Sequence, residues 1–247
     1  SSVKILGPAA FGNCSSLQSV SMSSGVDTID VYAFGNCTAL ESIDIPSSVK
    51  SIGKQAFLDC KKLSEITIPS SVTSISDETF CGCSSLTSVV LPEGITCLGW
   101  NAFNSSGLTS ITIPGSVTTV GVSAFWDCSK LTSVTIQEGL EKIEMNAFGK
   151  CASLGSINIP ESVTSIGDNA FWWCTSLTSV TIPESVTSIG VYAFHGCTSL
   201  PSISIPSKVT RIGDNTFDTC SSLTSVSIPS GVTSIGNSVF SGCNLTS

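Results

Sequence analysis

The chain has 247 residues, of which 41% are hydrophobic and only 11% are charged, well below the roughly 25% typical of globular domains. Its net charge is −8, and its ten Lys and Arg residues are scattered along the chain, so the sequence predicts no nucleic-acid partner. There is no run of about 18 apolar residues, which excludes a membrane-spanning helix and predicts no direct membrane insertion.

One block of about 23 residues is repeated along the whole chain. Eleven phenylalanines mark the period, because each follows the previous one after 23 residues, except for a step of 22 residues from Phe103 to Phe125. Counted from its first leucine as position 1, the shared pattern is L-x-x-V-x-I-P-x-x-V-x-x-I-G-x-x-A-F-x-x-C-x-x. A period in the twenties indicates a stacked leucine-rich solenoid. A solenoid has no fixed length, so we expect one continuous array over residues 1–247.

The array starts within a repeat at residues 1–16 and ends with the first letters of another at residues 245–247. The full repeats between them open at Leu17, Leu40, Leu63, Leu86, Leu108, Leu131, Leu154, Leu177, Leu200 and Leu223. A solenoid needs polar capping repeats, since an end repeat exposes the apolar face that a neighbour would cover. Neither end has such a sequence, so we expect a fragment of a longer array.

Each repeat should contain three short elements. The segment L-x-x-V-x-I alternates apolar and polar residues and usually stops at a proline, which predicts a strand. The segment V-x-x-I-G predicts an extended segment or a second strand. The alanine, phenylalanine and cysteine at positions 17, 18 and 21 have the spacing of one helical or 3₁₀ turn. Together they predict a right-handed leucine-rich-repeat horseshoe of about ten repeats, with short parallel strands on its concave face and little regular helix.

Stacking should place equivalent side chains in columns. Ten of the twelve cysteines occupy position 21, where neighbouring Cα atoms about 4.8 Å apart could form disulfides, but inward-pointing free thiols are favoured. Cys81 and Cys97 lie outside this column and are the candidates for reactive thiols. No C-x-x-C pair occurs and His195 is the only histidine, so the sequence predicts no metal site and no cofactor.

No arrangement of catalytic residues is recognisable. His195 occupies a position that varies among the repeats, and the sequence has no G-x-S-x-G or H-E-x-x-H motif. We therefore expect no enzymatic activity.

Two polar ladders should lie on the surface near the first strand. Strand positions 3 and 5 face outward and hold small polar residues that either suit a solvated face or form a hydrogen-bonding platform; examples are Ser133, Thr135, Ser179 and Thr181. Position 8 holds glutamates in consecutive repeats, including Glu161 and Glu184. They are either solvated residues of the repeat or a row of like charges that a cation or a basic partner would relieve.

Positions 15, 16, 19 and 20 should point outward around the turn, yet several of them are aromatic. Exposed aromatic clusters are enriched at interaction sites. Alternatively, the rings pack over neighbouring turns as a satellite cluster. The candidate partner-binding residues are Trp100, Trp126, Trp172, Trp173, Tyr192 and His195.

The unit SLTSVTIPESVTSIGVYAFHGCTSL at residues 176–200 resembles the BspA-like (Treponema-type) leucine-rich repeats of bacterial surface proteins and of some mucosal protozoan parasites. The resemblance rests on I-P-x-x-V, I-G-x-x-A-F and F-x-x-C together and covers nearly the whole chain. At residues 103–108 the repeat is one residue short and lacks its cysteine. The resemblance implies an extracellular or cell-surface array that mediates adhesion to proteins and carries no catalytic residues.

From the architecture, the aromatic residues and this resemblance we expect a recognition module that binds a protein partner, for example a host extracellular or surface protein. Two alternatives remain open. One is a structural spacer without a ligand of its own, and the other is a glycan- or ice-binding platform on the Ser/Thr ladder.

Overall fold

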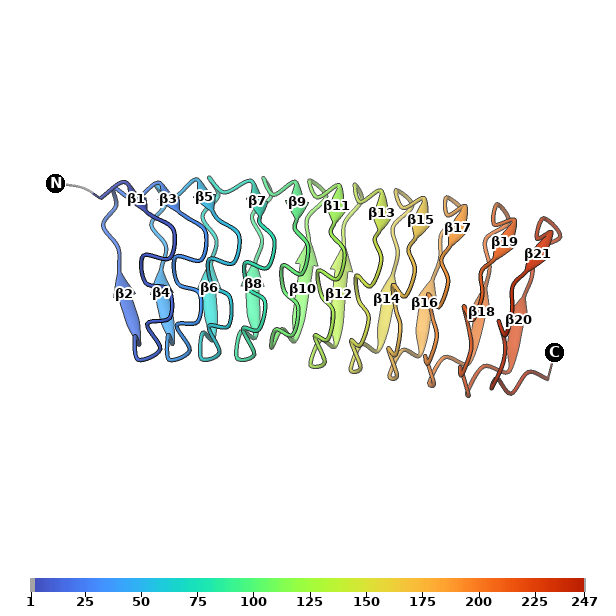
Figure 1. Cartoon of the computed structure of the whole chain (residues 1–247). Helices are drawn as coiled ribbons and strands as arrows, with labels where there is room; N and C mark the ends of the chain where they lie inside the picture. The colour runs from blue at the N-terminus through green and yellow to red at the C-terminus, as the bar shows by residue number, and fades with distance from the viewer. Residues whose placement is uncertain (1–2, 247) are drawn as a thin grey trace.

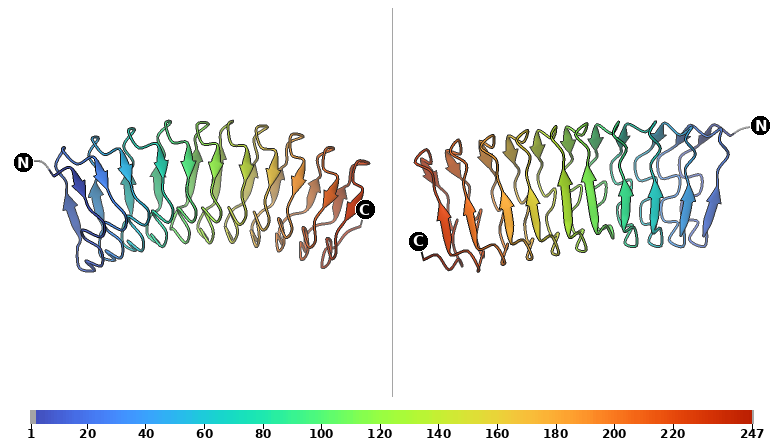
Figure 2. Two further views of the ribbon diagram at one scale, coloured as in Figure 1. Left: turned by 45° about the horizontal axis from the view of Figure 1, so that its top comes forward. Right: turned by 180° about the vertical axis from the view of Figure 1, so that it is seen from behind.

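The computed structural model describes residues 3–246 of the chain. Within them the backbone forms 21 strands of two to four residues and no helix. The strands stack into a gently curved row, with the two termini at its opposite ends (Figures 1 and 2). The predicted solenoid of about ten 23-residue repeats is confirmed.

Each of the ten full repeats contributes two strands, and the partial repeat before Leu17 contributes one, β1 (Ile5–Leu6). The first strand starts at position 3, and these strands are β2 (Ser19–Ser21), β4 (Ser42–Asp44), β6 (Glu65–Thr67), β8 (Ser88–Val90), β10 (Ser110–Ile113), β12 (Ser133–Ile136), β14 (Ser156–Asn158), β16 (Ser179–Thr181), β18 (Ser202–Ser204) and β20 (Ser225–Ser227). The second strand covers positions 12 and 13, and these strands are β1 (Ile5–Leu6), β3 (Thr28–Ile29), β5 (Ser51–Ile52), β7 (Ser74–Ile75), β9 (Cys97–Leu98), β11 (Thr119–Val120), β13 (Lys142–Ile143), β15 (Ser165–Ile166), β17 (Ser188–Ile189), β19 (Arg211–Ile212) and β21 (Ser234–Ile235).

The strands pair in parallel with the equivalent strand of the next repeat. Ser133 of β12 lies opposite Ser156 of β14, and Ile143 of β13 lies opposite Ile166 of β15. Identical positions therefore stack, so each apolar position becomes a buried column.

The predicted helical or 3₁₀ turn is wrong. Positions 16 and 20 have positive φ in every repeat, as at Tyr192 (58°) and Trp173 (56°), and a right-handed helix cannot continue through such residues. The amides at positions 17, 19 and 21 bond within the repeat, as His195 N does to Tyr192 O at 3.1 Å. Those at positions 16, 18 and 20 bond to the next repeat, as Phe194 N does to Thr216 O at 2.9 Å. The segment is therefore a series of turns tied to its neighbour.

Phenylalanine rings fill the centre of this turn side. Neighbouring rings of the column lie 5.1–5.7 Å apart between centroids and within 15° of parallel. Phe11 and Phe240, in the first and last turns of the described chain, are half-buried, whereas all the phenylalanines between them are fully buried. Offset ring stacking adds to the large apolar area that this column removes from water.

The cysteine column is buried and also forms hydrogen bonds. Eight of its ten thiols are buried, and every one after Cys14 donates its S–H to the phenylalanine carbonyl of the preceding repeat; for example, Cys174 Sγ lies 3.2 Å from Phe148 O. A disulfide would remove these donors. The column therefore uses free thiols, which agrees with the cysteine prediction.

One interruption of the strand ladder has an identifiable cause. Position 2 usually donates its amide to the preceding repeat, as Thr178 N does to Gly155 O at 2.8 Å. Pro201 has no amide hydrogen at this position, and β16 and β18 are not paired. The second strands β17 and β19 pair only through Ile189 and Ile212. The repeats that open at Leu177 and Leu200 therefore share few strand hydrogen bonds, whereas the hydrogen bonds between their turns are all present.

Replacing Phe148 by alanine should destabilise the protein by about 3–5 kcal/mol, because its ring lies 5.3 Å from that of Phe125 and 5.7 Å from that of Phe171. Denaturant unfolding measures the loss. The half-buried Phe11 is the matched control, and Phe11→Ala should cost less. An unchanged unfolding midpoint for Phe148→Ala would contradict the buried column.

Burial raises the pKa of the thiols of Cys60, Cys128, Cys174 and Cys220 from the ordinary value of 9.0 to about 12. Below pH 9 these groups are protonated in both the folded and the unfolded chain. Above pH 9 the unfolded chain releases protons that the folded chain keeps, so the free energy of unfolding should fall until about pH 12. The expected loss is about 1 kcal/mol per thiol and pH unit.

Urea unfolding at pH 8, 9 and about 10.5 tests this dependence. The matched variant is Cys174→Ala, which is less stable at every pH but should lose stability less steeply above pH 9 because one buried thiol is gone. An identical slope for the variant and the wild type would show that the thiol does not keep its proton in the fold.

Candidate functional site

Five of the six candidate aromatic residues lie together on the turn side of the array. We call them the aromatic cluster: Trp126, Trp172, Trp173, Tyr192 and His195. They come from three of the four successive repeats that open at Leu108, Leu131, Leu154 and Leu177, and each sits at an outward position of the turn. The stacking of repeats brings them together, although the chain separates Trp126 from His195 by three turns of the solenoid.

The centre of the cluster is a stack of rings at position 19. The rings of Trp126 and Trp172 lie 5.5 Å apart and 9° from parallel, although a whole repeat lies between them. That repeat has Gly149 at position 19, where a Cβ atom would lie 2.4 Å from the Trp126 ring. Because Gly149 has no side chain, the indole ring of Trp126 can occupy this space. Trp172 continues the stack to His195, at 6.1 Å and 16°.

Two more rings meet this stack edge-on. Trp173 lies at 69° to Trp172 and packs over Gly196, and Tyr192 stands at 80° to His195 with a centroid distance of 5.5 Å. Trp173 and Tyr192 remain 40% and 37% exposed, while Trp126 and Trp172 are half-buried. The rings thus both pack over neighbouring turns and offer an exposed aromatic surface. The interaction cluster and the satellite cluster, the two alternatives that the sequence leaves open, are therefore compatible.

Charged groups hold the stack at two points. Lys150 Nζ lies 5.4 Å from the Trp126 ring and 5.6 Å from the Trp172 ring, which is the geometry of a cation–π contact. At the other end, His195 Nδ1 lies 3.2 Å from Asp218 Oδ2. That nitrogen is buried and has no aligned hydrogen bond, so the contact with the carboxylate is one of proximity. The stack therefore has a cation beside its indole rings and a carboxylate beside its imidazole ring.

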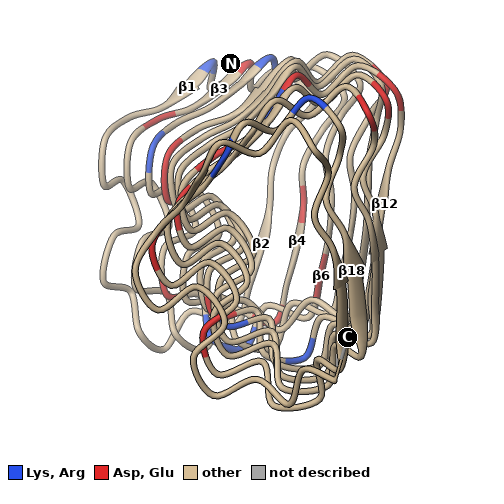
Figure 3. Ribbon diagram, turned by 90° about the vertical axis from the view of Figure 1, so that its right-hand side faces the viewer, with Lys and Arg blue, Asp and Glu red and all other residues tan. Residues whose placement is uncertain are grey.

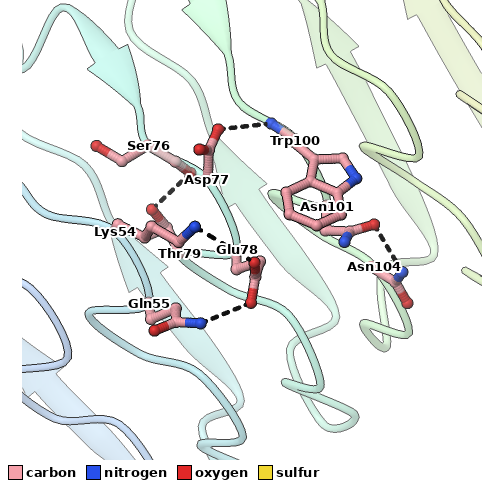
Figure 4. Close-up of polar contacts among 9 residues, drawn as sticks. All are labelled: Lys54, Gln55, Ser76, Asp77, Glu78, Thr79, Trp100, Asn101 and Asn104. Carbon is pink, nitrogen blue, oxygen red and sulfur yellow. Dashed lines mark hydrogen bonds and ion pairs between the residues drawn. The ribbon is translucent and has the colours of Figure 1, made fainter.

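Trp100 stands apart from the aromatic cluster. Its amide donates to Asp77 Oδ1 at 2.9 Å, and Lys54 Nζ lies 5.7 Å from its ring and 3.7 Å from Glu78 Oε1 (Figure 4). Its ring is 47% exposed and stacks on none of the other aromatic rings within residues 3–246. The sequence placed Trp100 with the other candidates, whereas the structure gives it a separate polar setting.

A hollow of about 360 Å³ adjoins the aromatic cluster. Its lining is Trp126, Asn146, Asn169, Trp172, Tyr192 and His195. Sequence reasoning did not single out the two asparagines. They occupy position 16, where positive φ favours Asn over most residues, so their identity alone does not distinguish a binding role from a backbone role.

The outward-facing hydroxyl groups at positions 3 and 5 of the first strand, which we call the strand face, have no hydrogen-bond partner among the described residues. Ser133, Thr135, Ser179 and Thr181 are exposed and form no side-chain hydrogen bond with another described residue. Hydroxyls at positions 2 and 11 are different, because they bond the preceding repeat, as Thr132 Oγ1 does to Thr109 O at 2.9 Å. Much of the Ser/Thr content therefore supports the stack, whereas the hydroxyls at positions 3 and 5 of the first strand remain available to a ligand.

Charge on the strand face is confined to one place. Asp44 of β4 and Glu65 of β6 are the acidic residues at positions 5 and 3, and both strands carry a red segment in Figure 3. These two residues line a hollow of about 300 Å³ together with the exposed Val90. The remaining strand positions carry small neutral side chains.

Two of the four glutamates at position 8, Glu138 and Glu184, accept hydrogen bonds from the next repeat. Glu184 Oε2 accepts hydrogen bonds from Ser207 Oγ at 2.6 Å and Ser207 N at 2.9 Å, which lower the pKa of this carboxyl. Glu138 likewise accepts from the amides of Glu161 and Ser162. Backbone amides and one serine hydroxyl thus relieve part of the charge that, in one of the two alternatives, a cation or a basic partner would relieve. Within residues 3–246 no group of three His, Cys, Asp or Glu side chains could hold a metal ion.

The family model for the BspA-type leucine-rich repeat region matches residues 4–132 and 124–247, with six copies of the repeat region. No curated protein matches the sequence. Within the described chain, no helix has the length and apolar character needed to cross a membrane.

Three solved bacterial structures are similar to this chain. A leucine-rich cell-surface protein of Faecalibacterium prausnitzii is 32% identical, with 98% of this chain and 81% of that one covered and a TM-score of 0.57. The leucine-rich repeat protein of T. pallidum is also 32% identical, over 73% and 77% of the two chains, with a TM-score of 0.56. A leucine-rich repeat protein of Bacteroides ovatus is 28% identical, over 89% and 82%, with a TM-score of 0.54.

Proposed function

Because this chain belongs to the BspA-type leucine-rich repeat family, we propose that it is a cell-surface recognition module that binds a protein partner through the aromatic cluster. The observation that carries the proposal is the gathering of five aromatic side chains at outward positions of the turn. The surface location is supported by the F. prausnitzii relative, which is described as a cell-surface protein.

The composition of the aromatic cluster suits a protein interface. Tryptophan and tyrosine are enriched among the few residues that carry most of the binding energy in such interfaces. They offer a large apolar area and a polar atom on each ring, and the exposed faces of Trp173 and Tyr192 are available for contact.

The aromatic cluster is also ordered before a partner arrives. Stacking, the position of Lys150 and the space over Gly149 fix the indole rings of Trp126 and Trp172. Binding then costs little additional side-chain entropy, which favours affinity for a given contact area.

The two alternatives differ from this proposal in where a ligand would bind. A spacer needs no exposed tryptophans, and the aromatic cluster therefore favours recognition. A platform for ice or glycans on the strand face is supported by the free hydroxyls of Ser133, Thr135, Ser179 and Thr181. That face lies on the strand side of each repeat, so variants of the turn would not affect it.

Replacing Trp126, Trp172 and Trp173 by alanine together should weaken binding to the partner at least about tenfold, because the variant loses the rings proposed as anchors. Surface plasmon resonance against a panel of purified extracellular matrix proteins measures the effect, with circular dichroism as a check of the fold. Trp100→Ala is the control, since it removes an indole that is at least as exposed as those replaced and lies outside the aromatic cluster. Undiminished binding by the triple variant would contradict the proposal.

A further inference from the structure

We infer that the hollow beside the aromatic cluster is a binding site for a neutral pyranose sugar. The inference rests on the proposed function, because it assigns the hollow to a sugar that the protein partner carries. It differs from the Ser/Thr platform, which lies on the strand face.

The lining of the hollow carries aromatic and amide groups and no carboxylate, lysine or arginine. A pyranose has an apolar face of C–H groups that can pack on the aromatic rings, and a rim of hydroxyls that needs hydrogen-bond partners. The Tyr192 and His195 rings stand at 80° to each other, so the aromatic lining forms a corner in which such a ring can rest.

The polar groups of the lining have unused hydrogen-bonding capacity. The side-chain amides of Asn146 and Asn169 and the hydroxyl of Tyr192 form no hydrogen bond with another described residue. Each amide offers two donors and an acceptor, and neighbouring sugar hydroxyls can accept and donate in return. A charged ligand would leave its charge without an opposite partner in this lining.

The backbone holds these three residues in a fixed row. Asn146, Asn169 and Tyr192 occupy position 16 of consecutive repeats, with φ of 60°, 55° and 58°. Their amides donate to the next repeat, to Asp168 O at 2.9 Å, Val191 O at 2.9 Å and Asp214 O at 3.1 Å. A polar row therefore faces the aromatic stack at position 19 across the hollow, and neither side depends on a mobile loop.

The surroundings disfavour an acidic sugar. Asp168 precedes one of the lining asparagines, Asp218 contacts His195, and the chain has a net charge of −8. A cation, Lys150, lies beside the lining, and its Nζ is already engaged with the Trp126 and Trp172 rings at 5.4 Å and 5.6 Å. The hollow of about 360 Å³ is at the small end of ligand sites and is open to solvent. Such a site suits one terminal sugar residue, with a Kd on the order of 1 mM.

Methyl glycosides of glucose, galactose, mannose and N-acetylglucosamine are the probes, used in saturation-transfer NMR and in titrations of the tryptophan fluorescence. The substitutions Asn146→Asp and Asn169→Asp keep a residue that tolerates positive φ but replace the amide donor by a negative charge. Each should weaken binding at least about fivefold. Asn215→Asp, at the same position of the next repeat but outside the hollow, should leave it unchanged.

No binding of any of the four glycosides up to about 50 mM overturns the inference, since that is far above the expected range. Glycoside binding that is equal in the wild type, Asn146→Asp and Asn169→Asp also overturns it, because the sugar then binds elsewhere. If the triple tryptophan variant loses the protein partner while no glycoside binds, this inference fails and the proposed function stands. If glycosides bind at the hollow but that variant keeps its protein partner, the proposed function fails instead.

Discussion

Hydrogen bonds from each repeat to the next hold the solenoid together. In the turn, backbone amides bond alternately within the repeat, as that of His195 does, and to the next repeat, as that of Phe194 does. The positive φ at positions 16 and 20 makes this alternation possible. The cysteine thiols add a second line of axial bonds to the phenylalanine carbonyls. A single repeat forms few hydrogen bonds within itself, so many of its backbone N–H and C=O groups find partners only in the neighbouring repeats. Its apolar side chains are likewise buried only when the repeats stack. Every residue is thereby placed directly against its equivalent one repeat away.

This placement explains how a simple repeated scaffold can form a specific surface. When several repeats carry an unusual side chain at an outward position, stacking brings those side chains into contact with one another. Trp126 and Trp172 come into contact because both occupy position 19 and because Gly149 leaves the position between them empty. Trp100 is at position 15 instead, and its neighbours are Lys54 and Asp77. The aromatic cluster thus forms because its residues occupy matching positions of nearby repeats and because Gly149 has no side chain.

The spacing of the sequence predicted the solenoid, the strands and the buried columns, because each depends on periodic apolar residues such as Phe148 and Cys174. It gave the wrong structure for the turn. Alanine, phenylalanine and cysteine have helical spacing, but position 16 holds residues as different as Tyr192, Asn146 and Glu78, which do not signal positive φ. The bonds of Glu184 were equally hidden, since its partner lies 23 residues away and is an ordinary serine. Exposed aromatics were recognisable one by one, but their grouping depends on Gly149 and on three-dimensional contacts.

Each repeat is one layer of a continuous stack, so whole repeats can be removed without changing the layers that remain. The most direct test is to delete residues 40–85, which are two complete repeats, joining Ala39 to Leu86, and to compare the variant with the full chain by small-angle X-ray scattering. The deleted segment lies outside the aromatic cluster. The particle should become about 10 Å shorter, twice the spacing of paired strands, while the radius of gyration of its cross-section stays the same. A variant that is unfolded, or that is folded with a different cross-section, would contradict this expectation.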